Sequence, residues 1–424
     1  MEMNGAQILI KAMEEQNVDI IFGYPGGAVL EIYDALLKSP IRHILVRHEQ
    51  GGAHAASGYA RASGKVGVCL ATSGPGATNL VTGIATAYMD SIPLVIITGQ
   101  VPRRMVGTDA FQEVDITGIT APITKHNYLV QKVQDIPKIV AEAFYIAKTG
   151  RPGPVLIDLP RDVAMELSEY KPYPKVDIRG YKPTLYGHPS MIKKAVKELK
   201  KSKKLLICIG GGVIHSQASA EVIQLAEMTG AKVVSTLMGL GGFPGDHPSF
   251  YGMLGTYGEK AANEAVQECD CFLALGMRFD DRVVGEPKGF APNAEIIHID
   301  IDPAEIGKNI RADLPIVGDI RNILRDILKE MHEEKEEMPQ HAPKNDSNER
   351  ICSDSGAPDC KAFRILKQMQ ATMPEDAIVT TDVGQHQIWT AKYCTFRKPR
   401  TFISSGGLGT MGYGIPAALG AQIA

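Results

Sequence analysis

Short runs rich in β-branched and aliphatic residues alternate with longer helix-like stretches over the first 165 residues of the chain. The short runs predict the strands Ile20–Phe22, His43–Arg47, Val66–Ala71, Pro93–Thr98 and Val155–Asp158. The longer stretches predict the helices Ala28–Lys38, Gln50–Ser63, Thr78–Met89 and Ile136–Thr149. Strands that alternate with helices favour a mostly parallel sheet with helices on both faces.

The same alternation recurs twice further along the chain. A second unit is predicted from the strands Leu205–Ile209, Lys232–Ser235, Cys271–Leu275 and Ile296–Ile301 and a closing helix, Ile320–Met331. A third begins with a helix near Lys361 and continues with the strand Ile378–Thr381, elements at Trp389–Tyr393 and Thr401–Ser404, and a Gly-rich turn into Gly412–Ala424. We therefore predict an α/β chain of three doubly wound parallel-sheet units.

Residues 167–187, with four Lys or Arg and three Pro, predict a linker. The polar stretch 333–360 predicts a second, because its composition buries too little apolar area to order itself. The predicted domains are then 1–166, 188–332 and 361–424. The last helix carries no stop signal before Ala424, and its unit is short for a domain. We expect a truncated third domain; a compact final subdomain with a frayed end is the alternative.

Composition narrows the class of protein. With 44% hydrophobic residues among 424, the chain can bury sizeable cores. The 45 basic and 48 acidic residues leave a net charge of −3, so no basic field attracts nucleic acid, and the basic run at 193–204 fits a solvated helix face. Seven cysteines without a Cys-x-x-Cys pair fit a reducing cytoplasm, and neither a signal peptide nor a membrane-spanning apolar run is present.

Candidate chemistry lies where strands of the first unit end. Glu49 follows a predicted strand and precedes small residues, which suggests a buried acid; taken alone, an ordinary helix-capping carboxylate is the more common case. Ser73–Asn79 is a Gly-rich turn before a helix, and it fits an anion or cofactor site or simply a tight turn. Tyr24–Ala28 is another turn at the same edge. Ligands of parallel sheets lie beyond the carboxyl ends of the strands, so we expect a ligand site here.

Weaker signals follow strands of the second unit. The run Ile209-Gly-Gly-Gly-Val lacks the third glycine of a dinucleotide fingerprint and is weak evidence for NAD. Asp300 suits a ribose hydroxyl or a solvated strand end. Arg278 and Arg282 suit a carboxylate clamp or ion pairs with the aspartates between them. Three histidines are dispersed without metal-ligand spacing: His54, His126 and His386.

The combination of these motifs is more specific than any one of them. In order along the chain they are Gly23–Ala28, Arg47–Gln50, Gly58–Arg61, Thr72–Asn79, Gly107–Glu113, Gly150–Val155, Arg278–Val283, His298–Ala304, Asp382–His386 and Gly407–Gly412. Together they closely resemble the catalytic large subunits of the acetolactate synthase family of thiamine diphosphate enzymes. The resemblance covers the whole chain except the second linker.

The resemblance implies an activity and an assembly. It implies decarboxylation of pyruvate on thiamine diphosphate and condensation of the hydroxyethyl group with a second 2-oxo acid, pyruvate or 2-oxobutyrate, as in branched-chain amino acid biosynthesis. It also implies FAD in the middle unit, a homodimer or homotetramer, and a regulatory small subunit. A flavin-using pyruvate oxidase, another 2-oxo acid enzyme of the same cofactor class, or a non-catalytic FAD-binding fragment are the alternatives.

Site residues follow from the matching motifs. The resemblance gives Glu49 a hydrogen bond to the pyrimidine nitrogen N1′, which promotes deprotonation of thiazolium C2. It places Gly27 and Ala28 along the pyrimidine and Gln112 near the reacting carbon. For the diphosphate and the bent cofactor conformation it points to Val383, Gly384, Gln385, His386, Gly409 and Met411. For FAD it points to Arg151, Tyr257, Arg278, Asp300 and Asp319, and for the substrate to Phe111, Arg161 and Arg282.

Three departures from the family pattern matter. Gly255-Thr-Tyr-Gly258 replaces the common Gly-Met-His-Gly, and Arg161 stands where Lys is frequent. The Gly-Asp-Gly…Asn motif that binds Mg²⁺ does not occur, so no metal ligand is assigned in this chain. We therefore expect these 424 residues alone to be inactive.

Overall fold

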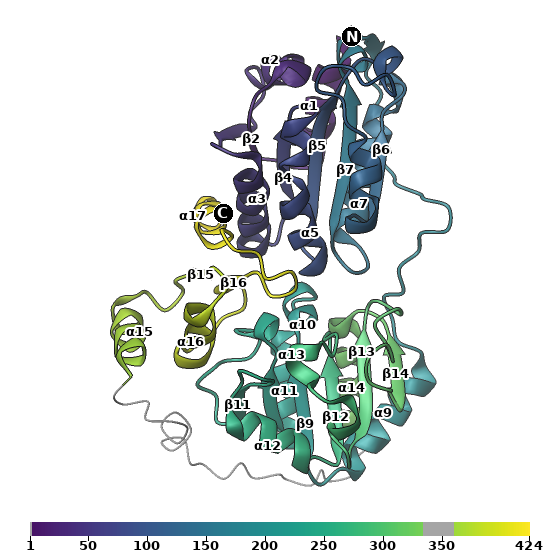
Figure 1. Ribbon diagram of the computed structural model, residues 1–424. Coiled ribbons are helices and arrows are strands. Elements are labelled where there is room, and N and C mark those ends of the chain that lie inside the picture. Colours follow the sequence, from purple (N-terminus) through teal and green to yellow (C-terminus); the bar gives the residue numbers. More distant parts are fainter. Residues whose placement is uncertain (1, 334–359) are drawn as a thin grey trace. The chain divides into compact units, whose positions relative to one another are not determined.

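The computed structural model describes residues 2–333 and 360–424 (Figure 1). They fall into two compact units. The first contains the chain up to Lys182 together with Thr380–Val383 and Ser405–Ala424. The second contains Pro183–Val379 and Gly384–Ser404. The predicted linker 333–360 lies almost wholly outside the described residues.

A parallel six-stranded sheet, in the order β3-β2-β4-β5-β7-β6, forms the centre of the first unit. Its strands are β2 (Ile20–Gly23), β3 (Arg42–Leu45), β4 (Gly67–Ala71), β5 (Leu94–Gln100), β6 (His126–Leu129) and β7 (Pro154–Pro160). The connecting helices are α1 (Gly5–Glu15), α2 (Leu30–Leu36), α3 (Glu49–Ser63), α4 (Pro75–Thr78), α5 (Val81–Met89), α6 (Ile116–Thr120), α7 (Ile136–Lys148) and α8 (Arg161–Met165). Two short strands, β1 (Glu2–Asn4) and β8 (Leu167–Glu169), pair antiparallel beside it.

Helices cover both faces of this sheet. Successive residues of a strand point to opposite faces, so each strand contributes side chains to two hydrophobic clusters. On β4, Val68 and Leu70 pack into the core cluster under α1 and α7, whereas Cys69 and Ala71 pack into the cluster under α3 and α5. Each fully buried aliphatic side chain contributes roughly 1.5–3 kcal/mol to folding. The predicted doubly wound layer is therefore confirmed for this unit.

The second unit repeats the plan, with all strands parallel in the order β11-β10-β9-β12-β13-β14. Its strands are β9 (Leu205–Ile209), β10 (Lys232–Ser235), β11 (Phe250–Met253), β12 (Cys271–Leu275), β13 (Glu295–Asp300) and β14 (Leu314–Val317). Its helices include α9 (Pro189–Lys201), α10 (Gly211–His215), α11 (Ser219–Thr229), α12 (Lys260–Glu268), α13 (Asp281–Val284), α14 (Ile320–Glu333), α15 (Lys361–Thr372) and α16 (Gln385–Tyr393).

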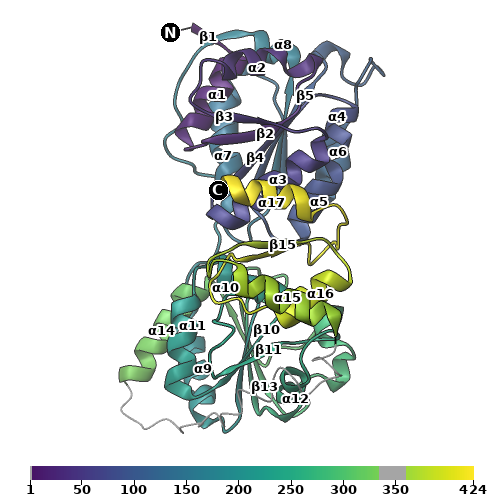
Figure 2. The same cartoon turned by 90° about the vertical axis from the view of Figure 1, so that its left-hand side faces the viewer.

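The remaining elements are β15 (Val379–Thr381), β16 (Phe402–Ser404) and α17 (Gly414–Ile423). Helix α17 packs along α3 inside the first unit, as Figures 1 and 2 show. Glycines allow this approach: a Cβ atom on Gly58 would lie 2.1 Å from the carbonyl oxygen of Ala417, and one on Gly420 would lie 1.8 Å from that of Ala55. The two backbones can touch only because both positions lack a side chain.

Some predicted boundaries differ from the structure. The helix predicted over residues 78–89 is interrupted, since α4 ends at Thr78 and α5 begins at Val81. Strand β3 ends at Leu45, two residues earlier than predicted. No helix within the described ranges is long and apolar enough to cross a bilayer.

Candidate functional site

The carboxyl edge of the first sheet carries the first group of predicted site residues. Strand β3 lies on one side of β2 in the sheet, and the next strands along the chain, β4 and β5, lie on its other side. The gap between β2 and β4 is therefore the topological switch point, where open α/β sheets bind their ligands. The turn Tyr24–Ala28 follows β2, and the turn Thr72–Asn79 follows β4.

Small residues bring these two turns into contact. A Cβ atom on Gly26 would lie 2.5 Å from the Cβ atom of Thr72, so only glycine fits there. The backbone N–H of Ala28 lies 3.3 Å from the Thr72 hydroxyl, to which it donates. Next to it, a Cβ atom on Gly27 would meet nothing within 4 Å. Backbone at Gly27 therefore borders open space, as a surface for a flat ring requires.

Glu49 is the first residue of α3 and is half-buried. Its Oε2 atom accepts a hydrogen bond of 2.9 Å from the Asn79 amide. Oε1 lies 3.3 Å from the position that a Cβ atom on Gly76 would take. His48 is the N-cap of α3 and accepts the Gln50 N–H at 3.2 Å, and Glu49 is the acidic residue of the first turn, where a carboxylate also interacts favourably with the helix dipole.

Gln112 reaches the same edge from the loop after β5. A Cβ atom on Gly74 would lie 2.7 Å from the carbonyl oxygen of Gln112, and Gln112 itself has a left-handed φ of 59°. The loop is fixed by Glu113, whose carboxylate accepts backbone N–H groups including that of Ala110 at 3.0 Å. These backbone hydrogen bonds lower the pKa of Glu113. The neighbouring Phe111 ring is exposed.

Other predicted residues of the first unit have partners within it. Arg161 begins α8, and its guanidinium contacts Glu31 of α2 at 3.2 Å. Arg151 precedes β7 and donates from Nε to the Ser91 hydroxyl at 2.8 Å. Neither contact tests the expected substrate or FAD role.

The Gly-rich segment that carries Gly409 and Met411 also lies in the first unit, with Val383. The hydroxyls of Thr410 and Thr86 are 2.7 Å apart, which ties this segment to α5. The Met411 side chain is exposed. By contrast, the other three residues expected at the diphosphate belong to the second unit, around the start of α16: Gly384, Gln385 and His386.

The carboxyl edge of the second sheet collects the remaining residues. Tyr257, Arg278, Asp300 and Asp319 occur at or just beyond the ends of β11, β12, β13 and β14, respectively. The order of strands reverses between β9 and β12, which makes that gap the switch point.

Backbone packing at this second switch point is close. A Cβ atom on Gly210 would lie 2.1 Å from the carbonyl oxygen of Gly276, and one on Gly276 would lie 2.6 Å from the Cα atom of Gly212. Gly276 also has a left-handed φ of 58°. The glycine run Gly210–Gly212 therefore serves close packing of a strand end.

The polar groups at this edge differ in burial. Asp300 is buried and accepts the N–H of Asp302 at 2.9 Å. Burial raises the pKa of Asp319, which also accepts the N–H of Asn322 at 3.1 Å. Arg282 is exposed and lies 3.7 Å from Asp281, one of the ion pairs considered from sequence.

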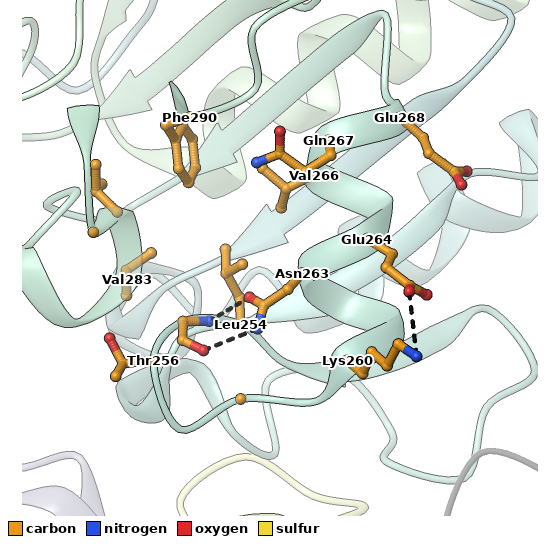
Figure 3. A pocket seen from close by; sticks show the side chains of 14 residues that line it. Leu254, Thr256, Lys260, Asn263, Glu264, Val266, Gln267, Glu268, Val283 and Phe290 are labelled. Carbon is orange, nitrogen blue, oxygen red and sulfur yellow. Dashed lines mark hydrogen bonds and ion pairs between the residues drawn. The ribbon is translucent and has the colours of Figure 1, made fainter. Parts of the chain in front are cut away.

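An open pocket of about 710 Å³ lies beside this edge in the second unit (Figure 3). The side chain of Asn263 fixes the backbone of Gly255 at the pocket: it accepts the N–H of Gly255 and donates to the carbonyl of Gly255, both at 3.0 Å. Three residues of the turn Gly255–Gly258 contribute to the lining, whereas Tyr257 and Arg278 do not.

Comparison with known proteins identifies the family. Models of thiamine pyrophosphate enzymes match residues 3–119 (N-terminal TPP-binding domain), 192–327 (central domain) and 382–424 (C-terminal TPP-binding domain). A probable acetolactate synthase large subunit of Methanocaldococcus jannaschii is 53% identical over all of this chain and 74% of its own length. An acetolactate synthase of Mycobacterium leprae is 50% identical, over 100% and 69%, and a large subunit of Corynebacterium glutamicum is 50% identical, over 99% and 68%.

The chain belongs to the acetolactate synthase large-subunit family. The predicted family, fold class and thiamine diphosphate-dependent activity are thereby confirmed. Relatives named acetolactate synthase match throughout the chain, which favours this activity over the pyruvate oxidase and non-catalytic alternatives. The chain spans about 70% of the length of these synthases, from 68% to 74% in the three cited.

One contact at the carboxyl edge of the first sheet was not foreseen from sequence. Asn79 was recognised only as the end of a Gly-rich turn, and its hydrogen bond to Glu49 was not expected. An amide side chain closing a turn of small residues is the signal that could have drawn attention to it. Within residues 2–333 and 360–424, no group of three or more His, Cys, Asp or Glu side chains could hold a metal ion.

Proposed function

We propose that the enzyme forms 2-acetolactate from two molecules of pyruvate, or 2-aceto-2-hydroxybutyrate from pyruvate and 2-oxobutyrate, with Glu49 as the essential carboxylate. The observation that carries this proposal is the position of Glu49, half-buried and hydrogen-bonded beside the switch point of the first sheet. A carboxylate held in this way can retain or release a proton at one defined atom.

The residues at this edge fit an aromatic pyrimidine. Glycine at positions 26, 74 and 76 keeps side chains out of the space between the turns, and the Gly27 backbone borders open space. Thiamine diphosphate, when bound, supplies the nucleophilic carbon and the electron sink for loss of CO₂. Glu49 would hold a proton against the pyrimidine nitrogen, while Gly27 and Ala28 orient the ring.

Other roles are proposed for groups around the site. Phe111, Gln112 and Arg161 of the first unit would contact the substrate. Separately, the exposed Arg282 guanidinium of the second unit suits a carboxylate. Contacts to the diphosphate and the thiazolium side are proposed for Val383, Gly384, Gln385, His386, Gly409 and Met411. Mg²⁺ belongs to the proposed activity, but the described residues form no cluster that fits it, so we assign it no ligand here.

FAD is proposed for the second sheet. Buried Asp300 at a strand end suits ribose hydroxyls, and Arg278 beside Gly276 suits a phosphate or the flavin. Tyr257 and Asp319 complete the proposed contacts at this edge.

We further propose a homodimer or homotetramer with a regulatory small subunit, located in the cytoplasm. Apolar side chains of the first unit support an additional partner surface, since Phe111 is 87% exposed, Met411 79% and Ile415 84%. The name "large subunit" of the relatives supports a smaller companion chain.

Substitution of Glu49 tests the central proposal. In the complete enzyme, Glu49→Gln preserves shape but removes the carboxylate, so the rate of acetolactate formation is expected to fall at least a hundredfold. Glu375→Gln, in an exposed turn, is the matched control and should retain full activity. Activity of Glu49→Gln within threefold of the unmodified enzyme would contradict the proposal.

A further inference from the structure

We propose that Asn79 is a positioning residue for Glu49, and that the turn Thr72–Asn79 holds this carboxylate rather than a phosphate. The inference rests on the function proposed for Glu49. Asn79 and Glu49 are thirty positions apart in the sequence, and the Asn79 amide Nδ2 donates a hydrogen bond to Glu49 Oε2 at 2.9 Å.

The core fixes the position of the Asn79 amide. Asn79 lies between Ala77 and Leu80, which are 1% and 0% exposed. Its backbone N–H also closes the end of α4 by donating to the carbonyl of Pro75 at 3.0 Å. A side chain with only two rotatable bonds, mounted on anchored backbone, presents its donor in one place.

Glu49 needs such a partner. A glutamate has three rotatable bonds, and a half-exposed carboxylate otherwise samples several rotamers. The bond to Asn79 fixes Oε2, and Gly76 leaves room beside Oε1 because any larger residue would place its Cβ atom 3.3 Å away. One oxygen is therefore held and the other remains available to a ligand.

The same turn is poorly suited to an anion. Pro75 has no N–H group, the N–H of Gly76 donates to the carbonyl of Ser73 at 3.3 Å, and that of Thr78 donates to Gly74 at 3.0 Å. The Glu49 carboxylate beside these groups would repel a phosphate. Of the sequence-based interpretations of this turn, an anion or cofactor site or a tight turn, our inference favours a tight turn that holds a carboxylate.

The test measures proton exchange at C2 of bound thiamine diphosphate in the complete enzyme without substrate, together with the dissociation constant of the cofactor. Asn79→Ala is expected to slow the exchange at least tenfold and to change the dissociation constant by less than threefold. Thr372→Ala, at the exposed end of α15, is the control and should do neither. Added to Glu49→Ala, Asn79→Ala should slow the exchange no further, because Asn79 acts through Glu49.

A conservative variant separates positioning from general damage. Asn79→Asp places a carboxylate against Glu49 and should slow exchange at neutral pH. Its defect should lessen as the pH falls, because a protonated aspartate is again a donor. A purely structural role would not produce this pH profile.

A cofactor-free readout completes the test. In thermal unfolding of the protein without cofactor, the shifts in melting temperature caused by Glu49→Ala and Asn79→Ala should be less than additive. Additive shifts, or wild-type exchange in Asn79→Ala while Glu49→Gln is slow, would overturn the inference and leave the proposed function standing. Wild-type exchange in Glu49→Gln would overturn both.

Discussion

The carboxylate of Asp90 accepts the backbone N–H of Gly407 at 2.6 Å, although 317 positions separate the two residues. Asp90 is buried at the end of α5, also accepts the N–H of Gly406 at 3.2 Å, and lies 3.7 Å from the Arg61 guanidinium. One buried ion pair in the first predicted domain thus holds the Gly-rich segment that leads to Met411.

Removing this charge should loosen the segment. We expect Asp90→Asn to lower the free energy of unfolding by about 2–4 kcal/mol, because the buried ion pair with Arg61 is lost and an uncharged amide oxygen is a weaker acceptor than a carboxylate. Urea unfolding measures the loss, and proteolysis within residues 405–424 should accelerate. Asp34→Asn on the exposed side of α2 is the control. An equal effect of the two substitutions would argue against this role.

The contact between α3 and α17 should tolerate no side chain at Gly420. A methyl group there would meet the carbonyl oxygen of Ala55 at 1.8 Å, so Gly420→Ala should destabilise the protein by more than about 2 kcal/mol. Gly51 is a helical glycine of α3 whose Cβ atom would meet nothing within 4 Å. Gly51→Ala should therefore stabilise by about 0.5–1 kcal/mol. Chemical denaturation of both variants checks the opposite signs.

Asp158 should make stability fall as the pH rises from about 4 to about 7. This carboxyl is 1% exposed on β7, and burial raises its pKa from 3.8 to about 7, against the lowering effect of hydrogen bonds from Thr98 and Gln100. Because the folded state binds the proton more tightly than the unfolded state, the stabilisation is complete below pH 4 and is lost as the pH passes 7.

Asp158→Asn tests this dependence. The substituted side chain is neutral at every pH, so a decline worth up to about 4 kcal/mol between pH 4 and pH 8 should disappear from the urea-unfolding free energies. Asp34→Asn should leave the decline unchanged. An identical pH profile for Asp158→Asn and the unmodified protein would show that Asp158 is not responsible.

Gly276→Ala should release the proposed FAD. At its left-handed φ of 58°, a Cβ atom would lie 2.6 Å from the Cα atom of Gly212 and from Cδ1 of Ile320, so the strand ends must separate. We expect flavin absorbance per purified chain to fall below about a tenth of its normal value. Gly289→Ala, where a Cβ atom meets nothing within 4 Å, should retain flavin. Full flavin in Gly276→Ala would contradict the placement of FAD at this edge.

The central strands were predictable from sequence because they are apolar along their whole length. Leu205–Ile209 and Cys271–Leu275 lie inside the second sheet and are buried throughout, and both were predicted with the observed bounds. The missed strands β6, β11 and β14 are all at sheet edges. An edge strand is covered on fewer sides, so its sequence carries a weaker apolar signal.

Part of the candidate site could likewise be predicted from sequence and part could not. Glu49 and the glycine turns were recognisable because they follow strands at a parallel-sheet edge. The hydrogen bond from Asn79 was not, because a side-chain contact across thirty residues has no periodic signal. The roles of the individual site residues remain predictions.

The sequence by itself determined that this chain builds parallel α/β layers and carries the motifs of the acetolactate synthase family. Alternating strands and helices, buried strands and glycine turns each depend on residues that are close together in the chain. Tertiary structure alone decided that Asn79 meets Glu49, that Asp90 meets Gly407, and that α17 lies on α3. Those contacts depend on which backbones can approach closely in space, and a linear sequence does not specify that separation.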